Sequence, residues 1–245
     1  MSGGVSFDRA AGPEGMRVYA IGDVHGRRDL LERMLEKIDA EIARDGPGDW
    51  RIVLLGDYVD RGPDSAGALD LIARRAEDGR VIALMGNHDQ RLAMFLDDIS
   101  DWPNFEEFGG RPTAASYGVD FASGAGADLV RGHEALRIAM PDAHRHLLAG
   151  LKLAAQFGDF FFCHAGIRPG VPLDAQDVDD LIWIRRPFHD DPRLHPKVIV
   201  HGHTPVRRAE IHPNRVNLDT RAFGSGILSA LSIEGAEKAV LTVEE

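Results

Sequence analysis

Residues 52–62 read Ile-Val-Leu-Leu-Gly-Asp-Tyr-Val-Asp-Arg-Gly. The first four residues form an unbroken apolar run, which is typical of a strand buried on both faces of a parallel sheet. The glycines let the backbone turn sharply directly after that run, and they flank carboxylates and an arginine. The stretch therefore predicts a central strand whose carboxyl end carries polar, chemically useful side chains.

The segments on either side repeat this order. Residues 17–26 begin with an apolar run and end in GDVHG. Residues 81–89 likewise begin with an apolar run and end in GNHD. Between these runs, apolar residues recur at helical spacing over residues 30–42 and 65–76. Strands that alternate with helices predict βαβ units and a partly parallel sheet.

The second half of the chain changes character. Residues 90–150 have a mostly helical pattern broken by glycine and proline, so we expect a helical insertion at about 90–150 within one domain spanning residues 16–245. Short β-type runs then return at 153–157, 160–163, 197–200, 215–218, 227–233 and 239–243. The pair 153–157 and 160–163 flanks Gly158-Asp159, which is typical of a hairpin turn.

The composition narrows the class of protein. A chain of 245 residues with 44% hydrophobic residues can build one large core. Its 28 basic and 39 acidic residues give a net charge of −11, which disfavours nucleic acid as a partner. The single cysteine, Cys163, cannot form an internal disulfide, and we find no apolar span for a membrane and no secretory signal. We therefore expect a cytoplasmic protein with a flexible tail at residues 1–15.

Five apolar runs in all end in a glycine-flanked cluster of Asp, Asn or His. The two clusters not yet named are His164-Ala-Gly, after residues 160–163, and His201-Gly-His203-Thr, after residues 198–200. One such cluster alone is more often a turn than a ligand site, but five are improbable as coincidence. Because ligands in open α/β sheets lie beyond the carboxyl ends of the strands, we expect one shared site.

The residue types in these clusters predict a metal site. Carboxylate oxygens together with imidazole nitrogens suit manganese, with iron or zinc as alternatives, whereas calcium would require nearly all oxygen ligands. There are enough donors for two divalent ions if one carboxylate bridges them. Two such ions about 3.5–4 Å apart form a clamp that can hydrolyse a phosphate ester.

The motifs GDVHG, GDYVDRG, GNHD, HAG and HGHTP, which span residues 22–205, resemble those of the calcineurin-like metallophosphoesterases. More narrowly, they are similar to the phosphoprotein phosphatase branch, which includes bacterial serine/threonine protein phosphatases. The resemblance implies an α/β/β/α sandwich of mixed sheets with a helical insertion. It also implies a two-metal centre in which a water between the metals attacks phosphorus, with six ligands: Asp23 and His25 on the first metal, Asp57 as the bridge, and Asn87, His164 and His203 on the second.

The resemblance also assigns catalytic roles. His88 is expected to act as the general acid, with Asp60 orienting its imidazole and raising its pKa. Arg61 and Arg185 are expected to hold phosphate oxygens. Arg186, adjacent to Arg185, competes for that assignment.

Two further residues stay open at this stage. His201 lies two residues before His203, and the resemblance places the ligand at His203. Asp219 resembles part of a family segment, but a turn at the end of a strand explains it equally well. Whether His201 or Asp219 contributes to the site therefore stays undecided, as does the oligomeric state.

The resemblance leaves the substrate between two classes. Tyr58, Asp60 and residues 109–118 are similar to protein phosphatases, so the expected substrate is phosphoserine or phosphothreonine in a protein. Asp89, which ends GNHD, is more similar to dinucleoside tetraphosphate hydrolases, so a phosphorylated small molecule, diadenosine tetraphosphate, is the alternative. A catalytically inactive binding scaffold is disfavoured, because no expected ligand is missing from the motifs.

Overall fold

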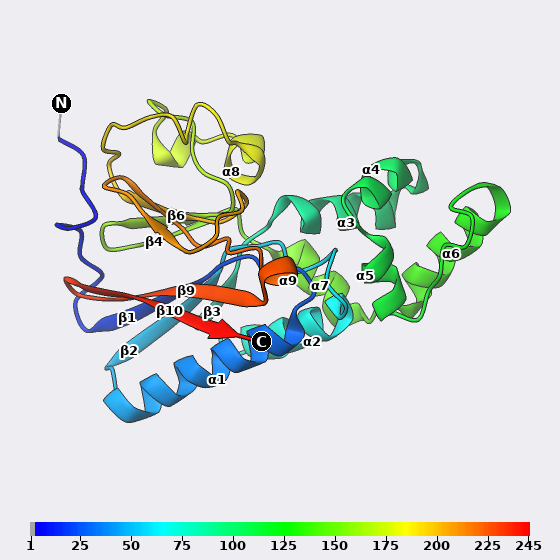
Figure 1. The fold of residues 1–245 in the computed structure, drawn as a ribbon, viewed down its shortest axis with the longest axis horizontal. Coiled ribbons are helices and arrows are strands. Elements are labelled where there is room, and N and C mark those ends of the chain that lie inside the picture. The colour runs from blue at the N-terminus through cyan, green and yellow to red at the C-terminus, as the bar shows by residue number, and fades with distance from the viewer. Residues whose placement is uncertain (1–2) are drawn as a thin grey trace.

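The computed structural model describes residues 3–245 and contains two five-stranded sheets packed face to face. The strand order is β10-β9-β1-β2-β3 in the first sheet and β4-β5-β6-β8-β7 in the second. Each sheet combines parallel and antiparallel pairs. Figure 1 shows helices outside both sheets, which confirms the expected α/β/β/α sandwich of mixed sheets.

The elements up to β3 follow the predicted alternation of strand and helix, and the helices of the predicted insertion follow. They are β1 (Met16–Ile21), α1 (Arg28–Asp45), β2 (Asp49–Leu54), α2 (Ser65–Ala76), β3 (Val81–Ala83), α3 (Asn87–Asp97), η1 (Ile99–Asp101), α4 (Trp102–Glu107), α5 (Arg111–Ser116), α6 (Gly126–Ala139) and α7 (Asp142–Gly150). The remaining elements are β4 (Ala154–Phe157), β5 (Phe160–Cys163), η2 (Leu173–Ala175), α8 (Val178–Trp183), β6 (Val198–His201), β7 (Glu210–Ile211), β8 (Arg215–Asn217), α9 (Ala222–Ser225), β9 (Ile227–Glu234) and β10 (Glu237–Glu244).

Alternation along the strands divides the core into layers. In β2, Ile52 and Leu54 face α1 and α2, whereas Val53 faces the second sheet. In β5, Phe160 and Phe162 face the first sheet, whereas Phe161 packs beneath α8. Successive side chains of a strand point to opposite faces, so an unbroken apolar run supplies two layers at once.

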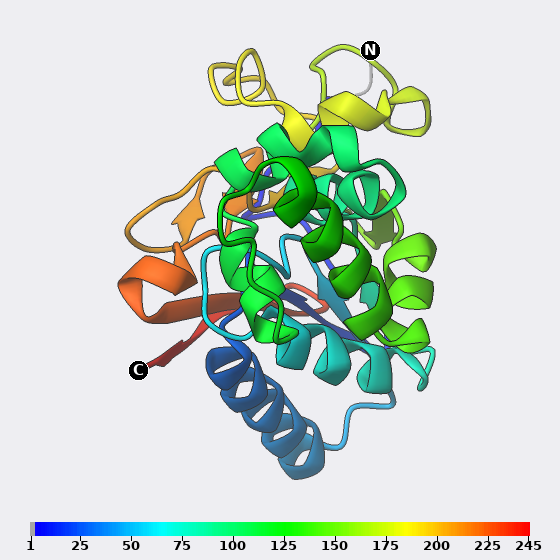
Figure 2. The ribbon, with the colours of Figure 1, turned by 90° about the vertical axis from the view of Figure 1, so that its right-hand side faces the viewer.

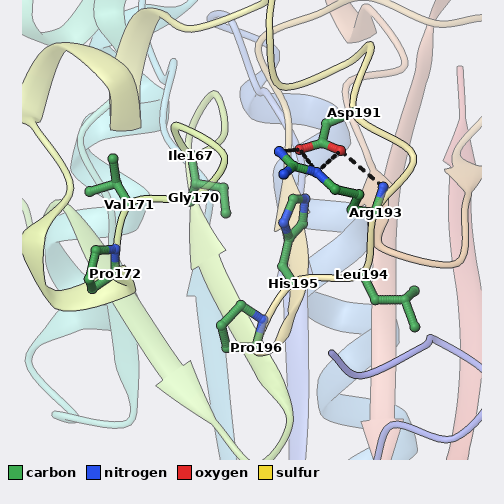
Figure 3. Close-up of a pocket in the computed structure, with 9 residues that line it drawn as sticks. All are labelled: Ile167, Gly170, Val171, Pro172, Asp191, Arg193, Leu194, His195 and Pro196. Carbon is green, nitrogen blue, oxygen red and sulfur yellow. Dashed lines mark hydrogen bonds and ion pairs between the residues drawn. The ribbon is translucent and has the colours of Figure 1, made fainter. Parts of the chain in front are cut away.

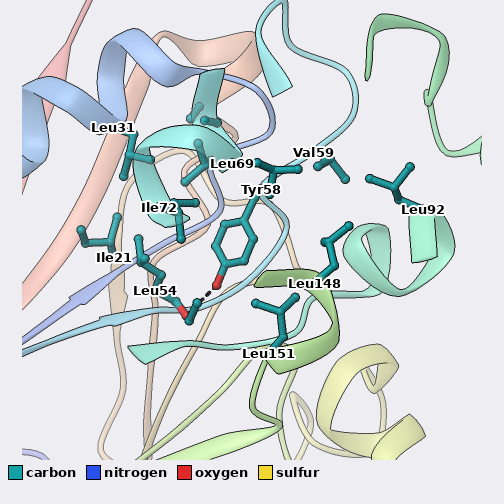
Figure 4. Packing of buried hydrophobic residues seen from close by; sticks show 14 of the residues in the cluster. Ile21, Leu31, Leu54, Tyr58, Val59, Leu69, Ile72, Leu92, Leu148 and Leu151 are labelled. Carbon is teal, nitrogen blue, oxygen red and sulfur yellow. Dashed lines mark hydrogen bonds between the residues drawn. The ribbon is translucent and has the colours of Figure 1, made fainter. Parts of the chain in front are cut away.

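Tyr58 belongs to this core and lies away from the surface. It is fully buried among leucine and isoleucine side chains (Figure 4), and its hydroxyl lies 2.7 Å from the carbonyl oxygen of Leu84 and 3.1 Å from that of Leu54. A buried tyrosine usually finds such a partner for its hydroxyl. Tyr58 therefore ties the loop after β2 to the core and does not reach a substrate.

The helices α3 to α7 occupy residues 87–150 between β3 and β4. Figures 1 and 2 show them gathered at one end of the sandwich, where they cover the carboxyl ends of β1, β2 and β3. Phe95, Phe105 and Trp102 give the insertion an aromatic core that is continuous with that of the first sheet. This placement brings the insertion next to the polar loops.

Part of the segment expected to be a flexible tail is packed against the domain. Phe7 and Ala10 are buried, and the Phe7 ring lies edge-on against Phe160. The backbone N–H of Val5 donates to the carbonyl oxygen of His195, and that of Phe7 donates to Pro213. These apolar side chains close one edge of the space between the sheets, which explains why residues 3–15 differ from a loose tail. Within residues 3–245, no helix has both the length and the apolar composition needed to cross a bilayer.

Candidate functional site

The predicted ligands lie in five loops at the same end of the two sheets. Asp23 and His25 follow β1, Asp57 follows β2, and Asn87 opens α3 directly after β3. His164 follows β5 and His203 follows β6 in the second sheet. All six side chains are buried. The parallel strands β1, β2 and β3, and likewise β5 and β6, thus deliver their carboxyl ends to one place.

Two groups of donor atoms form where these loops meet. Donor atoms of His25, Asp57 and His88 lie within 4.8 Å of one another, and those of Asp57, His164 and His203 form a second such group. Asp57 belongs to both groups. Asn87 adjoins the second group, because its Oδ1 lies 3.0 Å from Nε2 of His164 and 2.8 Å from Nδ1 of His203.

Asp23 lies beside these groups and belongs to neither of them. Its carboxylate accepts a hydrogen bond from the backbone N–H of His203 at 3.0 Å. A Cβ added to Gly202 would lie 1.9 Å from Oδ1 of Asp23, so only glycine allows the two loops to approach this closely. The contact joins the β1 and β6 loops across the two sheets.

Backbone carbonyl groups fix the orientation of two imidazole rings. Nδ1 of His25 donates to the carbonyl oxygen of Val59 at 2.9 Å, and Nδ1 of His164 donates to that of Leu55 at 2.9 Å. The Nε2 atoms of both rings therefore face Asp57. Nδ1 of His203 faces the same place, because it lies 2.8 Å from Oδ1 of Asn87. Imidazole rings whose nitrogens converge with carboxylate and amide oxygens in this way fit metal ligation.

The electrostatics of the site also fit bound cations. Burial and the charge of Asp219 raise the pKa of Asp23 well above its ordinary value. Burial lowers the pKa of His164, but Asp57 outweighs this by charge and hydrogen bonding, and the pKa is raised to about 10. The buried carboxylates thus hold a proton on a predicted ligand. Divalent cations would neutralise the same negative charge, so the donor set fits a two-metal centre.

His88 and Asp60 are brought together as predicted. Nδ1 of His88 lies 2.7 Å from Oδ2 of Asp60, and both side chains are buried. Burial raises the pKa of Asp60, and its contacts with His88 oppose that rise. The insertion completes the arrangement, because the Thr113 hydroxyl donates to Oδ1 of Asp60 at 2.7 Å and accepts from the Asp60 backbone N–H at 2.8 Å.

A small cleft opens onto this pair. It has a volume of about 170 Å³, and its lining includes Asp57, His88, Arg61 and Arg185. Nη2 of Arg61 lies 2.9 Å from Nε2 of His88. Arg185 is exposed and lines the cleft, whereas Arg186 pairs with Asp190 at 3.2 Å. Two guanidinium groups therefore flank an opening above the donor atoms.

In the sequence, Asp89 pointed only to a substrate class and was given no part in building the site. Its carboxylate accepts hydrogen bonds from the backbone N–H groups of Asp57 at 2.7 Å, Tyr58 at 2.9 Å and Gly86 at 3.0 Å. Burial and the neighbouring Asp57 raise the pKa of Asp89 to about 7. Asp89 thus clamps the β2 and β3 loops together beneath the donor groups.

The two undecided residues take different positions. The His201 ring packs against Phe188 and His189 at 5.1 and 5.3 Å, and it belongs to neither donor group. The backbone turns between His201 and His203, because His203 has a φ of 65°. Asp219 is buried near Asp23, and its Oδ1 accepts from the backbone N–H of Arg221 at 2.9 Å.

The backbone is strained at the predicted site. The non-glycine residues with positive φ in residues 3–245 are His25, Asp57, Asp60, Arg61, His203 and Arg221, with φ between 44° and 72°. This left-handed region costs an ordinary residue about 1–3 kcal/mol, and such strain concentrates at functional sites. All but Arg221 were singled out from the sequence as site residues.

Comparisons with known proteins agree with this arrangement. A family model described as calcineurin-like phosphoesterase matches residues 16–228. An asymmetrical bis(5'-nucleosyl)-tetraphosphatase from Halalkalibacterium halodurans is 27% identical over 235 residues, which cover 88% of this chain and 89% of that protein. A symmetrical bis(5'-nucleosyl)-tetraphosphatase from Paracidovorax citrulli is 43% identical over 77 residues, 31% of this chain and 25% of its own. A solved structure described as a candidate diadenosine tetraphosphatase covers 95% of this chain and 98% of its own, with 23% identity and a TM-score of 0.66.

Proposed function

The chain belongs to the calcineurin-like phosphoesterase family, and on that premise we propose that it hydrolyses a dinucleoside polyphosphate such as diadenosine tetraphosphate. The observation that carries this proposal is the 27% identity to an asymmetrical bis(5'-nucleosyl)-tetraphosphatase along 88% of the chain. The resemblance therefore extends well beyond the motifs shared by the family. It favours the alternative substrate of the sequence analysis over a phosphoprotein.

We propose that two divalent ions, with manganese as the first choice, bind on either side of Asp57, one beside His25 and the other beside His164. Asp23 and His25 would hold one ion and Asn87, His164 and His203 the other, with Asp57 shared between them. The shared position of Asp57 and the contacts of Asn87 Oδ1 with His164 and His203 support this assignment. When bound, such ions supply an activated water and offset the negative charge of the phosphate.

The protein's own side chains bind the phosphate and supply the proton for the leaving oxygen. Arg61 and Arg185 hold phosphate oxygens in the cleft, where their planar guanidinium groups can each form paired hydrogen bonds. His88 gives its Nε2 proton to the oxygen that leaves phosphorus, and Asp60 holds the ring by its Nδ1–H. In the structure Nη2 of Arg61 donates to Nε2 of His88 at 2.9 Å, so Arg61 has to turn toward phosphate and Nε2 has to take a proton from solvent before His88 can give that proton to the leaving oxygen.

One observation favours protein phosphatase activity as the second candidate. Asp60 is buried against His88, and an acid at this position is similar to the protein phosphatases. A carboxylate that supports the proton donor matters most when the leaving group is a poor one, such as a serine or threonine alkoxide. The same pair would also serve a polyphosphate substrate, so it does not outweigh the resemblance along the chain.

The test is a parallel assay of the manganese-loaded protein with diadenosine tetraphosphate and with phosphoserine and phosphothreonine peptides. We expect the higher kcat/KM for the dinucleotide. Chromatography of the products separates AMP with ATP from two ADP, which identifies the bond that is cleaved. A higher kcat/KM for the phosphopeptides would make the second candidate the better one. The Asp57→Asn variant, prepared in the same way, measures any contaminating activity.

Replacing Thr113 by valine is expected to lower kcat about tenfold without changing the metal content. The variant has nearly the same shape but leaves Oδ1 of Asp60 without its hydrogen bond, and hydrogen bonds to charged groups contribute about 1.5–3 kcal/mol. The Thr113→Ser variant keeps the hydroxyl and should recover most of the rate. A fall in melting temperature with no change in kcat would mean that Thr113 only supports the fold.

A further inference from the structure

We propose that a groove beside the cleft binds the phosphates of the substrate that lie beyond the one being attacked. This inference rests on the proposed function, because only a polyphosphate substrate carries such phosphates. The groove has a volume of about 240 Å³, and its lining includes Arg207, Thr220 and Arg221. Pro205 lines both this groove and the cleft that holds His88. The two spaces therefore lie side by side, and in this proposal an extended chain of phosphates reaches across both.

The arginines of the groove are free to bind an anion. Arg207 and Arg221 are exposed, and within residues 3–245 neither forms an ion pair with a carboxylate. Most other arginines of this acidic chain do form one, for example Arg17 with Asp45 and Glu234. Exposed guanidinium groups without a carboxylate partner are well suited to paired hydrogen bonds with phosphate.

Phe223 connects the cations of the cleft with those of the groove. The guanidinium group of Arg61 lies 5.1 Å from the centre of its ring, and that of Arg221 lies 5.3 Å from the same centre. Such cation–π contacts hold a guanidinium group in place while leaving its N–H groups free to donate. Arg185, Arg61, Arg221 and Arg207 thus line two adjoining spaces, on a protein whose net charge is −11.

The position of the groove fits this role. Arg221 directly precedes α9, which Figure 1 shows at the end of the sheets that faces the helical insertion, where the site loops also gather. The backbone N–H of Val206 donates to the carbonyl oxygen of Asp219 at 2.9 Å, so the two segments that line the groove are fixed to each other. The groove is therefore built into the structure beside the predicted ligands.

A larger pocket elsewhere lacks these properties. The pocket in Figure 3 has a volume of about 410 Å³, and its lining includes His195, Asp191 and Arg193. Its arginine is already paired, because Arg193 contacts the Asp191 carboxylate at 2.6 and 2.8 Å. The pocket shares no lining residue with the cleft. It therefore offers no free cation and no path from the reacting phosphate.

The backbone conformation of Arg221 allows a substitution that tests the groove without destabilising the fold. Arg221 has a φ of 58°, a conformation that glycine adopts without strain. The Arg221→Gly variant removes the guanidinium group and relaxes the backbone, so its melting temperature should equal or exceed that of the wild type. Loss of affinity in this variant therefore does not arise from unfolding.

The experiment measures KM for diadenosine tetraphosphate and for p-nitrophenyl phosphate with Arg221→Gly, Arg207→Gln and the double variant, all loaded with manganese. We expect the double variant to raise the KM for the dinucleotide about tenfold relative to that for p-nitrophenyl phosphate, because it loses charged hydrogen bonds only to the outer phosphates. Arg221→Lys should keep part of the affinity. Arg33→Gln is the matched control, because Arg33 is exposed on α1 and has no ion pair among the described residues.

The outcomes separate this inference from the function it rests on. If the wild type cleaves the dinucleotide and the double variant has the same KM, the proposed role of the groove is wrong and the proposed function still holds. An equal rise in KM for both substrates also contradicts the proposed role of the groove, because the arginines would then affect binding in the cleft as a whole. Cleavage of phosphopeptides without cleavage of the dinucleotide by the wild type overturns both.

Discussion

The Asp57→Asn variant is expected to lose both metals and more than about a thousandfold in kcat. Asp57 is the one residue whose donor atoms belong to both groups, and its carboxylate lies 3.5 Å from Nε2 of His25 and 3.4 Å from Nε2 of His164. A neutral amide cannot replace the charge that two cations would share. Elemental analysis of the purified variant and its steady-state rate measure the two effects.

The substitution is chosen so that the loop stays in place. Oδ1 of Asp57 accepts the backbone N–H of His88 at 3.0 Å, and the asparagine oxygen can accept the same bond. Asp89 still receives the backbone N–H groups of residues 57 and 58. We therefore expect the variant to melt near the temperature of chelator-treated wild type. Full activity with both metals retained would contradict the shared role of Asp57.

The His88→Asn variant is expected to lose about 10²–10⁴ in turnover while keeping its metals, as is usual when a general acid is removed. Its loss should be greatest for substrates whose leaving group needs a proton, such as alkyl phosphates. It should be smallest for p-nitrophenyl phosphate, whose leaving oxygen departs as a stable anion. Rates across such a series, together with metal content, test the role directly.

The metal content of this variant is decisive, because His88 also lies in the donor group of His25 and Asp57. Loss of one metal would make His88 a ligand and remove it as the proton donor. The Asp60→Asn variant is the matched control, since Asp60 contacts Nδ1 of His88 but belongs to neither donor group. It should keep both metals and lose less activity than His88→Asn.

Sequence patterns predicted the βαβ units and the partly parallel sheet because the strands are short and apolar, whereas the two-sheet sandwich was implied by the family resemblance. The run at 52–55 supplies both faces of β2, and the hairpin at 153–163 pairs as expected. Other elements had no periodic signal. The two-residue strand β7 exists only because it pairs with β8, and the six-residue helix α8 exists because it covers the second sheet. β7 forms a short hairpin with β8, and α8 packs on residues far along the chain, so neither element shows as a periodic apolar pattern in the sequence.

Residues of the site also differ in whether the sequence alone could identify them. Residues with chemical signatures, such as Asp57 and His203, could be named from their motifs and do meet in space. Thr113 and Phe223 could not, because their roles depend on long-range contacts with Asp60 and Arg61. Tyr58 was counted as a point of resemblance to protein phosphatases, and the structure shows that its side chain is buried in the core. A motif residue can support the fold as well as the chemistry.

The left-handed backbone at His25, Asp57, Asp60, Arg61 and His203 has a consequence for how the sequence drifts over generations. Glycine at any of these positions would relieve about 1–2 kcal/mol of strain. A lineage freed from selection for turnover would therefore gain stability by acquiring glycine at those positions where the relief of strain exceeds the side-chain hydrogen bonds that are lost, and it would gain the same relief at Arg221. Loss of activity among descendants of this chain should then be marked by glycines at such positions on an otherwise intact fold. A programme that screens variants for thermostability alone would select the same substitutions and discard the enzyme.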